Sequence, residues 1–309
     1  MSEMIDPTVE APVDPVLPQT KNGKPLSKWS LYTRRFMRNK PAVGGIIIFI
    51  LLVLFAIVGP LIGRYDHVEL DFLNLGTPPS ADHWFGTTAS GNDTFAQVAL
   101  GTQRSLMIAI TVSVGVTVLS AIIGTAAAYF GGWGERITLT VIHFMMVIPS
   151  FLILSLMSNR AGGNWIVIAL IMVFIVGWYF PARVVWTTAL SLREREYVHA
   201  ARYMGVGGFK IVMRHLIPNI GSLLVINFTL GIVNAVMTET GLSFIGFGVK
   251  IPDVSLGSLI GSGANTITSA PWLFYFPAAA LTLLTISMAL VSDGLRDALD
   301  PTSAAGGRA

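Results

Sequence analysis

The sequence has no cysteine and few charged side chains among its 309 residues. Without cysteine, the chain can form no disulfide, thiol nucleophile, iron–sulfur cluster or cysteine-ligated zinc site. Charged residues make up 12% of the chain, about half of the ~25% that is typical of soluble globular domains. So few charges cannot cover the surface of soluble domains of this length, which excludes an ordinary cytosolic enzyme, a disordered protein and a disulfide-stabilised scaffold.

The chain has instead long runs without any charged residue, and its mean hydropathy is +0.67. The hydrocarbon core of a bilayer is about 30 Å thick and is crossed by ~20 helical residues. The predicted spans lie at about 41–62, 105–130, 137–157, 165–185, 220–238 and 272–291. The first is too long for a cleavable signal peptide and is interpreted as a signal anchor. The sequence therefore predicts an all-α integral membrane protein with a six-span domain at 41–301.

Lysine and arginine are distributed unevenly about these spans. With six spans both ends of the chain lie on one side, and sixteen of the 20 basic residues fall on that side. The others are Arg64, Arg104, Arg160 and Lys250. Because loops rich in Lys and Arg stay in the cytoplasm, we expect a protein of the cytoplasmic (inner) membrane with both termini cytoplasmic. The basic pI of 9.3 then follows from topology, and no nucleic-acid partner is expected.

Three segments flank the spans. Residues 1–28 are rich in proline and polar residues and lack a helical apolar period, which predicts a disordered cytoplasmic tail. Residues 29–40 alternate aromatic and basic side chains, which favours an interfacial segment with rings at the lipid headgroups. Residues 302–309 are interpreted as a short cytoplasmic tail.

Polar side chains inside the predicted spans are few. His143, Asn227 and Asn234 are candidates to line a pathway, because a polar residue at membrane depth is a functional candidate by default. A hydrogen bond to a neighbouring helix explains His143 more simply than a proton relay does. Glu239 is predicted to lie at the outer end of the fifth span, at the interface, so no carboxylate is expected at mid-span.

Two smaller patterns are a face of small residues in the second span and a histidine beside an aspartate in the outer loop. Ser120, Gly124 and Ala128 recur every four residues, which favours close helix packing either within the chain or against a second subunit. In the 64–104 outer loop, His83 stands beside Asp82. Two adjacent residues make no coordination sphere, so we interpret His83 as a loop contact rather than a metal ligand.

The 186–218 segment is predicted to be a helix, a glycine turn and a second helix. Ser191 followed by Glu194 resembles a capping box at a helix start. Gly205 is expected to end the first helix in the left-handed conformation, with Gly207 and Gly208 in the turn. The second helix is expected over 209–216, limited by Pro218.

The first of these helices carries an apolar stripe. Tyr197, Ala200, Ala201 and Met204 fall at i, i+3, i+4 and i+7. Of the charges around the stripe, the spacing allows only Arg193 and Glu196 to pair. The stripe alone is compatible with docking a soluble cytoplasmic partner or with lying on lipid.

These residues carry a resemblance to a known family. EYVHAARYMG (196–205), followed nine residues later by HLIP (215–218), resembles the cytoplasmic signature of the permease subunits of binding-protein-dependent ABC importers. Ala200, Ala201, Gly205 and Pro218 are in register, and His199 stands where the family usually has Glu. HWFGT (83–87), ETGLSFIGFG (239–248) and DGLRDALDP (293–301) are similar to the second, C-type permease subunit of the oligopeptide/dipeptide branch. The chain departs from the family at Thr88 and Asn92.

The resemblance implies a type I ABC importer permease fold and a function in the import of di- or oligopeptides. The implied partners are a second homologous permease subunit, two cytoplasmic ATPases that bind ATP and Mg, and an extracytoplasmic peptide-binding protein. By implication, the 191–218 loop couples ATPase closure to pathway opening. The residues assigned to coupling are Glu196, Tyr197, Val198, His199, Ala200, Ala201, Met204, Gly205, Arg214 and Pro218.

The chain itself has no GxxxxGK[ST] loop, so it is not expected to hydrolyse ATP, and no cofactor, metal or catalytic residue is predicted in it. The alternative is a secondary transporter or half-transporter for small solutes. That class needs intramembrane ionisable groups and inverted repeats, and neither is apparent. An intramembrane enzyme would need paired carboxylates or a His/Ser constellation at membrane depth, where only His143 is found.

The topology is testable with reporter fusions. Because basic loops are retained in the cytoplasm, fusions after Arg136 and Arg202 are expected to report a cytoplasmic position, and a fusion after Asp82 an external one. An external position after Arg202 would contradict the assignment of the 191–218 loop to the cytoplasm.

Overall fold

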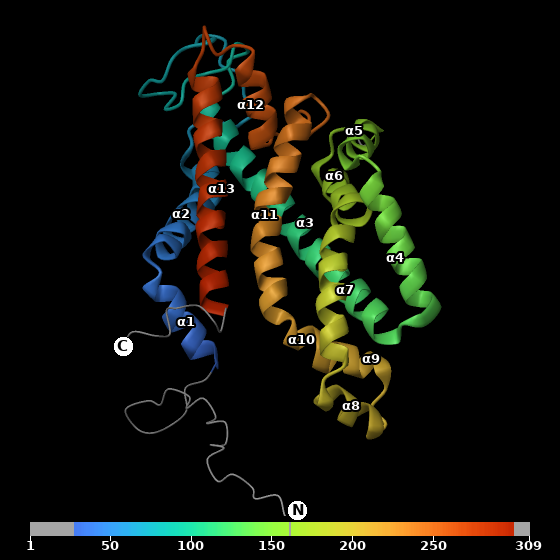
Figure 1. The fold of residues 1–309 in the computed structure, drawn as a ribbon. Helices are drawn as coiled ribbons and strands as arrows, with labels where there is room; N and C mark the ends of the chain where they lie inside the picture. Colours follow the sequence, from blue (N-terminus) through green and yellow to red (C-terminus); the bar gives the residue numbers. More distant parts are fainter. Residues whose placement is uncertain (1–27, 161, 300–309) are drawn as a thin grey trace, which may run out of the picture.

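The computed structural model describes residues 28–160 and 162–299, and in these residues the regular elements are all helices (Figure 1). The elements in chain order are α1 (Lys28–Arg38), α2 (Lys40–Ile62), α3 (Thr94–Phe130), α4 (Gly132–Val147), α5 (Ser150–Arg160), α6 (Trp165–Ile171), the π-helical η1 (Met172–Gly177), α7 (Tyr179–Arg193), α8 (Glu196–Tyr203), α9 (Gly208–Ile211), the π-helical η2 (Val212–Leu216), α10 (Ile217–Asn219), α11 (Gly221–Phe244), α12 (Leu256–Ala264) and α13 (Trp272–Leu299). The tails predicted at 1–28 and 302–309 lie outside the described residues, apart from Lys28 at the start of α1.

Four helices are long and apolar enough to cross a membrane, namely α2, α3, α11 and α13. Two bent pairs also qualify, α4 with α5 and α6–η1 with α7, so there are six spans if each pair is one span. The all-α fold with four to six spans agrees with the predicted fold class. The interfacial segment predicted at 29–40 is largely helical, as α1, and the side chain of Phe36 is buried beside Ala42 of α2 and Val291 of α13.

The third and fourth predicted spans are not straight. α4 and α5 meet at 83°, where Ile148 adopts an extended conformation. Ile148 precedes Pro149, and a residue before proline is driven out of the helical region. The second break, of 45°, separates η1 from α7. There Pro181 supplies no N–H to continue the hydrogen-bond ladder of a straight helix.

The boundaries of the other spans also differ from the prediction. α3 begins at Thr94 because the Asp93 carboxylate caps it, accepting a hydrogen bond from the backbone N–H of Ala96 at 2.9 Å. Its 37 residues make a helix about 55 Å long. α11 continues to Phe244 and α13 to Leu299, beyond the predicted ends. α12 was not predicted, since its segment is rich in Gly and Ser; its start is a capping box between Ser255 and Ser258.

α3 is the central element. It packs against α2 and α13 on one side, α7 and η1 on the other, and α11 along its length. In Figure 1 it runs obliquely between the α11–α13 layer and the α6–α7 layer. α1 and the C-terminal end of α13 lie at the same end of the molecule as α8 and α9, while the 63–93 loop and α12 lie at the opposite end. Both described ends of the chain are therefore on one side, as an even number of spans requires.

The Ser120, Gly124 and Ala128 face of α3 packs inside the chain. All three residues are buried. A Cβ placed on Gly124 would lie 2.6 Å from the Ala182 carbonyl oxygen and 2.8 Å from Val185 Cγ1, both on α7. The structure thus decides between the two open alternatives for this face, because α7 of the same chain occupies it.

Gly124→Ala is expected to destabilise the α3–α7 contact. The added methyl group meets backbone that cannot move aside, and overpacking of this kind costs about 1–3 kcal/mol. The measurement is the thermal midpoint of the detergent-solubilised protein. The matched control is Gly44→Ala in α2, where an added Cβ meets nothing within 4 Å. Equal midpoints for the two variants would contradict the close crossing.

Candidate functional site

The connection between α7 and α11, residues 194–220, has a small hydrophobic core of its own. Its buried side chains are Val198, Ala201, Ile211, Val212 and Leu216. Tyr129, near the C-terminal end of α3, packs against this core. One side of α8 is therefore held rigidly against η2 and the end of α3.

Gly205 ends α8 as predicted. Its φ is +77°, in the left-handed region. The N–H of Gly205 donates to the Arg202 carbonyl at 3.0 Å, and the N–H of Val206 donates to the Ala201 carbonyl at 3.1 Å. This pair of bonds is a Schellman motif, which satisfies carbonyls that the helix end would leave free. Gly207 instead has φ −61° and ψ 142° and is the N-cap residue of α9.

Two boundary predictions in this region are wrong. Ser191 does not cap a helix, because α7 runs to Arg193 and the Ser191 hydroxyl donates to the Thr188 carbonyl at 2.8 Å. A serine hydroxyl inside a helix bonds the preceding turn in this way. Pro218 does not limit the second helix either. The wider turn of η2 leads into α10, and Pro218 lies in the first turn of α10, where no N–H is required.

The predicted apolar stripe divides between the two sides of α8. Ala201 faces the core, together with Val198. Tyr197, Ala200 and Met204 are exposed, Tyr197 to 41% and Met204 to 77%.

Two aromatic residues that the stripe did not include extend this surface, Tyr203 at 88% exposure and Phe209 at 71%. They were missed because the stripe was counted from Tyr197, from which Tyr203 is at i+6, and because Phe209 lies beyond the glycine turn. We call the surface of Tyr197, Ala200, Tyr203, Met204 and Phe209 the α8 face.

The predicted pair of Arg193 with Glu196 is also wrong. Arg193 ends α7 and Glu196 begins α8, so the spacing rule for one helix does not apply. Arg193 pairs with Glu194 at 2.8 Å and also donates to the Ala128 carbonyl of α3 at 2.7 Å. The Arg193 hydrogen bond lowers the pKa of Glu194, and His199, 3.5 Å from the same carboxylate, adds to the effect.

The remaining residues assigned to coupling are Glu196, Arg214 and Pro218, and all are exposed. None of them contributes to the core of the connection.

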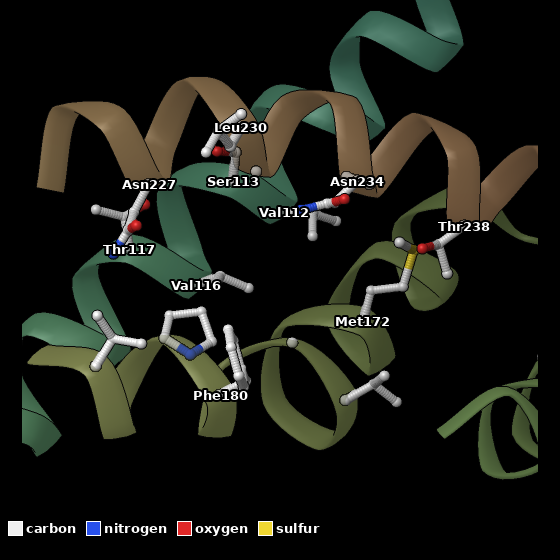
Figure 2. Close-up of a pocket in the computed structure, with 16 residues that line it drawn as sticks. Val112, Ser113, Val116, Thr117, Met172, Phe180, Asn227, Leu230, Asn234 and Thr238 are labelled. Atoms are coloured by element: carbon white, nitrogen blue, oxygen red, sulfur yellow. The ribbon is translucent and has the colours of Figure 1, made fainter. Parts of the chain in front are cut away.

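A cavity of about 240 Å³ lies between α3, η1–α7 and α11. Figure 2 shows the two candidate asparagines, Asn227 and Asn234, projecting from α11 toward it. Met172 and Phe180 form the facing wall. None of the 16 lining residues is charged. The structure thus brings two of the three pathway candidates together, while their role in a pathway stays a prediction.

His143 is not at this cavity. It lies on α4, and its Nε2 accepts a hydrogen bond from Arg183 Nη1 of α7 at 2.7 Å. The guanidinium of Arg183 also lies 4.6 Å from the centre of the Trp186 ring. The predicted hydrogen bond between His143 and a neighbouring helix is confirmed.

The comparisons with known proteins agree with this architecture. Residues 120–304 match the family described as "Binding-protein-dependent transport system inner membrane component", and residues 27–79 match "N-terminal TM domain of oligopeptide transport permease C". The chain belongs to this permease family. The first match includes the whole 194–220 connection and two of the helices around the cavity, α7 and α11.

Curated relatives extend over nearly the whole chain. The permease is 41% identical to the oligopeptide transport system permease protein OppC of Mycobacterium tuberculosis (strain H37Rv), over 90% of this chain and 96% of that protein. It is 35% identical to OppC of Bacillus subtilis, over 90% and 91%. A putative peptide permease protein of Brucella suis is 33% identical, over 86% and 89%.

Glu239 of the permease lies near the C-terminal end of α11, and its place at the membrane interface stays a prediction. Its side chain is fully buried. The hydroxyls of Ser243 and Ser255 each donate to its Oε1 at 2.6 Å. Ser255 is also the N-cap of α12, so one carboxyl group joins α11 to α12. The sequence did not reveal this contact because α12, which folds back on α11, was not predicted.

In the 63–93 loop of the permease, His83 is a buried loop contact, as predicted. Its Nδ1 lies 2.9 Å from Asp93 and its Nε2 lies 3.3 Å from Asp71, and Tyr65 stacks on the ring at 4.4 Å. Asp82 pairs instead with Arg64 at 2.8 Å. Within residues 28–160 and 162–299, no group of three or more His, Asp or Glu side chains is placed to hold a metal ion.

Two further polar contacts stabilise this loop. Hydrogen bonds from the Asn74 side chain and from the backbone N–H of Leu73 lower the pKa of Asp71. Thr88 and Asn92, where the sequence departs from the family, hydrogen-bond to each other at 3.0 and 3.2 Å.

Glu239→Ala is expected to destabilise the α11–α12 contact. It leaves two buried hydroxyls without their acceptor, and each such loss costs about 1–3 kcal/mol. Glu239→Gln keeps a carbonyl oxygen at the same place and is expected to behave like the wild type. Both are compared by thermal unfolding in detergent, and an unchanged midpoint for Glu239→Ala would show that the hydroxyls do not depend on this carboxyl group.

Proposed function

We propose that this chain is the membrane-spanning permease subunit of an ATP-driven importer that passes di- or oligopeptides across the cytoplasmic membrane. Membership of the binding-protein-dependent permease family supports this, as do relatives named oligopeptide transport permeases. The observation that carries the mechanism is the α8 face. It presents Tyr197 and Met204 at α8, whose opposite side is fixed in a core, and Phe209 on the adjoining α9.

The partners of this proposal are a second homologous permease subunit, two ATPases and an extracytoplasmic peptide-binding protein. ATP and Mg bind the ATPases, and this chain hydrolyses nothing itself. The α8 end of the molecule is cytoplasmic, together with both termini. The excess of Lys and Arg on that side supports this orientation.

Coupling follows from how the α8 face is attached. A partner groove that moves the face must also move the core of Val198, Ala201 and Leu216, because packed interiors shift as units. Tyr129 and the Arg193–Ala128 hydrogen bond connect that core to the end of α3. α3 carries Ser113 and Thr117 of the cavity lining. ATPase closure is thereby converted into displacement of a cavity wall, a rigid-body mode of switching.

A secondary transporter is the weaker alternative. A proton-coupled transporter needs an ionisable group on the path of the proton, and the cavity lining contains none.

Gly205→Val tests the coupling role of α8. A side chain with a Cβ in the left-handed conformation costs about 1–2 kcal/mol, which is small beside the membrane-embedded helices but enough to redirect α8. We expect normal membrane levels, an ATPase rate near the basal value in the purified complex, and little peptide uptake with saturating binding protein.

The matched control is Gly207→Val. Gly207 has φ −61° and ψ 142°, which suit a β-branched residue, and an added Cβ meets nothing within 4 Å. It should transport like the wild type. Wild-type uptake by Gly205→Val would mean that this glycine is not the cap of a coupling helix.

A further inference from the structure

The cavity between α3, η1–α7 and α11 contains hydrogen-bonding groups that the chain leaves unused. Asn227 and Asn234 lie two turns apart on α11, about 10 Å at the standard helical rise, and both point toward the cavity (Figure 2). Within the described residues, the side-chain amide nitrogen of Asn227 is buried and has no hydrogen-bond partner. Buried donors in native proteins are normally paired, so this one points to a ligand.

The hydroxyl groups of the lining differ in their availability. Ser113 is occupied, since its hydroxyl donates to the Phe228 carbonyl of α11. Thr117 of α3 and Thr238 of α11 also line the cavity, and Thr238 follows Asn234 by one turn on the same helix. Amides and hydroxyls both donate and accept, so these four side chains offer neutral hydrogen-bonding groups to the cavity.

The chemistry of the lining selects a class of ligand. A charged lining would favour peptides of the opposite charge, and this lining has no charge. Neutral donors and acceptors match the C=O and N–H groups of a peptide backbone, which all peptides share. The facing wall of Met172 and Phe180 is apolar and adaptable. The ~10 Å between the two asparagines equals about three residues of extended chain at ~3.3 Å per residue.

We propose that Asn227, Asn234, Thr117 and Thr238 form a transit site that hydrogen-bonds the backbone amides of a passing peptide. This site does not distinguish peptides by side-chain charge. The inference rests on the proposed function and adds the recognition chemistry to it. A helix of the second permease subunit is the competing occupant of the cavity, and the experiments below separate the two.

The first test is Asn234→Asp in the complete importer, reconstituted with its partner subunits and binding protein. Uptake is measured for a matched lysine-containing and glutamate-containing peptide of equal length. A carboxylate at the site repels acidic peptides, so the Lys/Glu uptake ratio should rise at least about tenfold over the wild type. The preference of the binding protein is the same in both complexes and cancels from the comparison.

The matched control is Asn265→Asp. Asn265 is an exposed asparagine at the end of α12, outside this cavity. It receives the same chemical change and should leave the ratio unchanged. A complex of Asn234→Asp that takes up peptide with the wild-type ratio would overturn the transit site while leaving the proposed function standing. A wild-type complex that takes up no peptide would overturn the proposed function itself.

The second test uses the absence of cysteine from the chain. Asn234→Cys introduces a single thiol, and its modification by a maleimide is followed on this subunit in the assembled importer. Turnover with peptide, binding protein and ATP should slow modification severalfold, whereas Asn265→Cys should be unaffected. Blockage by assembly alone, before peptide is added, would assign the cavity to the subunit interface and overturn the transit site.

Discussion

The hydrocarbon core of a membrane offers no hydrogen-bond partner to a peptide group, so each N–H and C=O there must be paired within the protein. This constraint decides where the chain can leave a regular helix. α2, α3, α11 and α13 satisfy their backbone groups along unbroken helices. The bent pairs break at Ile148–Pro149 and before α7. Some side-chain hydroxyls are paired in the same way. Ser113 donates to Phe228 and Thr102 to Val98, each to a backbone carbonyl. Four buried side-chain atoms of the described residues have no partner, on Thr94, Asn227, Glu239 and Thr240, and of these residues Asn227 lines the cavity.

Features set by local chemistry were predictable from sequence. The spans follow from charge-free runs, and the end of α8 follows from Gly205, since only glycine takes φ +77° without strain. Features that need a partner element were not predictable. The capping box at Ser191 had the right residues, but α7 continued through it. The burial of Glu239 was not predictable, because α12, which packs over it, lies in a Gly- and Ser-rich segment that was not expected to be a helix.

The candidate site, like the fold, was predictable only where residue type or a motif was sufficient. Residue type alone identified Asn227 and Asn234, and the resemblance identified the α8 stripe. Periodicity could not tell which members of the stripe face inward, because the core of the connection is completed by η2, which lies beyond the glycine turn. Tyr203 and Phe209 are the most exposed aromatic side chains of the α8 face. Both lie outside the i, i+3, i+4, i+7 series that begins at Tyr197. His143 shared its polarity with the asparagines, and only the position of Arg183 explains it.

One of the segments that resemble the peptide permeases, ETGLSFIGFG, has a structural explanation. Gly246 has φ +84°, and its N–H donates to the Ser243 carbonyl while that of Phe247 donates to Leu242, a second Schellman motif. Glu239 and Ser243 in the same segment hold the cap of α12. These residues therefore close the α11–α12 corner and do not line the cavity, which Asn227, Asn234 and Thr238 line from the same helix.

α11 thus lines the cavity along part of its length and packs against α12 near its C-terminal end. α3 connects the two ends of the molecule. Asp93 caps α3 at one end and also contacts His83 of the 63–93 loop. At the other end Arg193 and Tyr129 connect α3 to the core beneath α8. α3 has no proline in its 37 residues, and proline is the commonest cause of a sharp kink. Under the coupling proposed above, a displacement of α8 reaches the cavity wall as a tilt of α3, a helix without a proline kink.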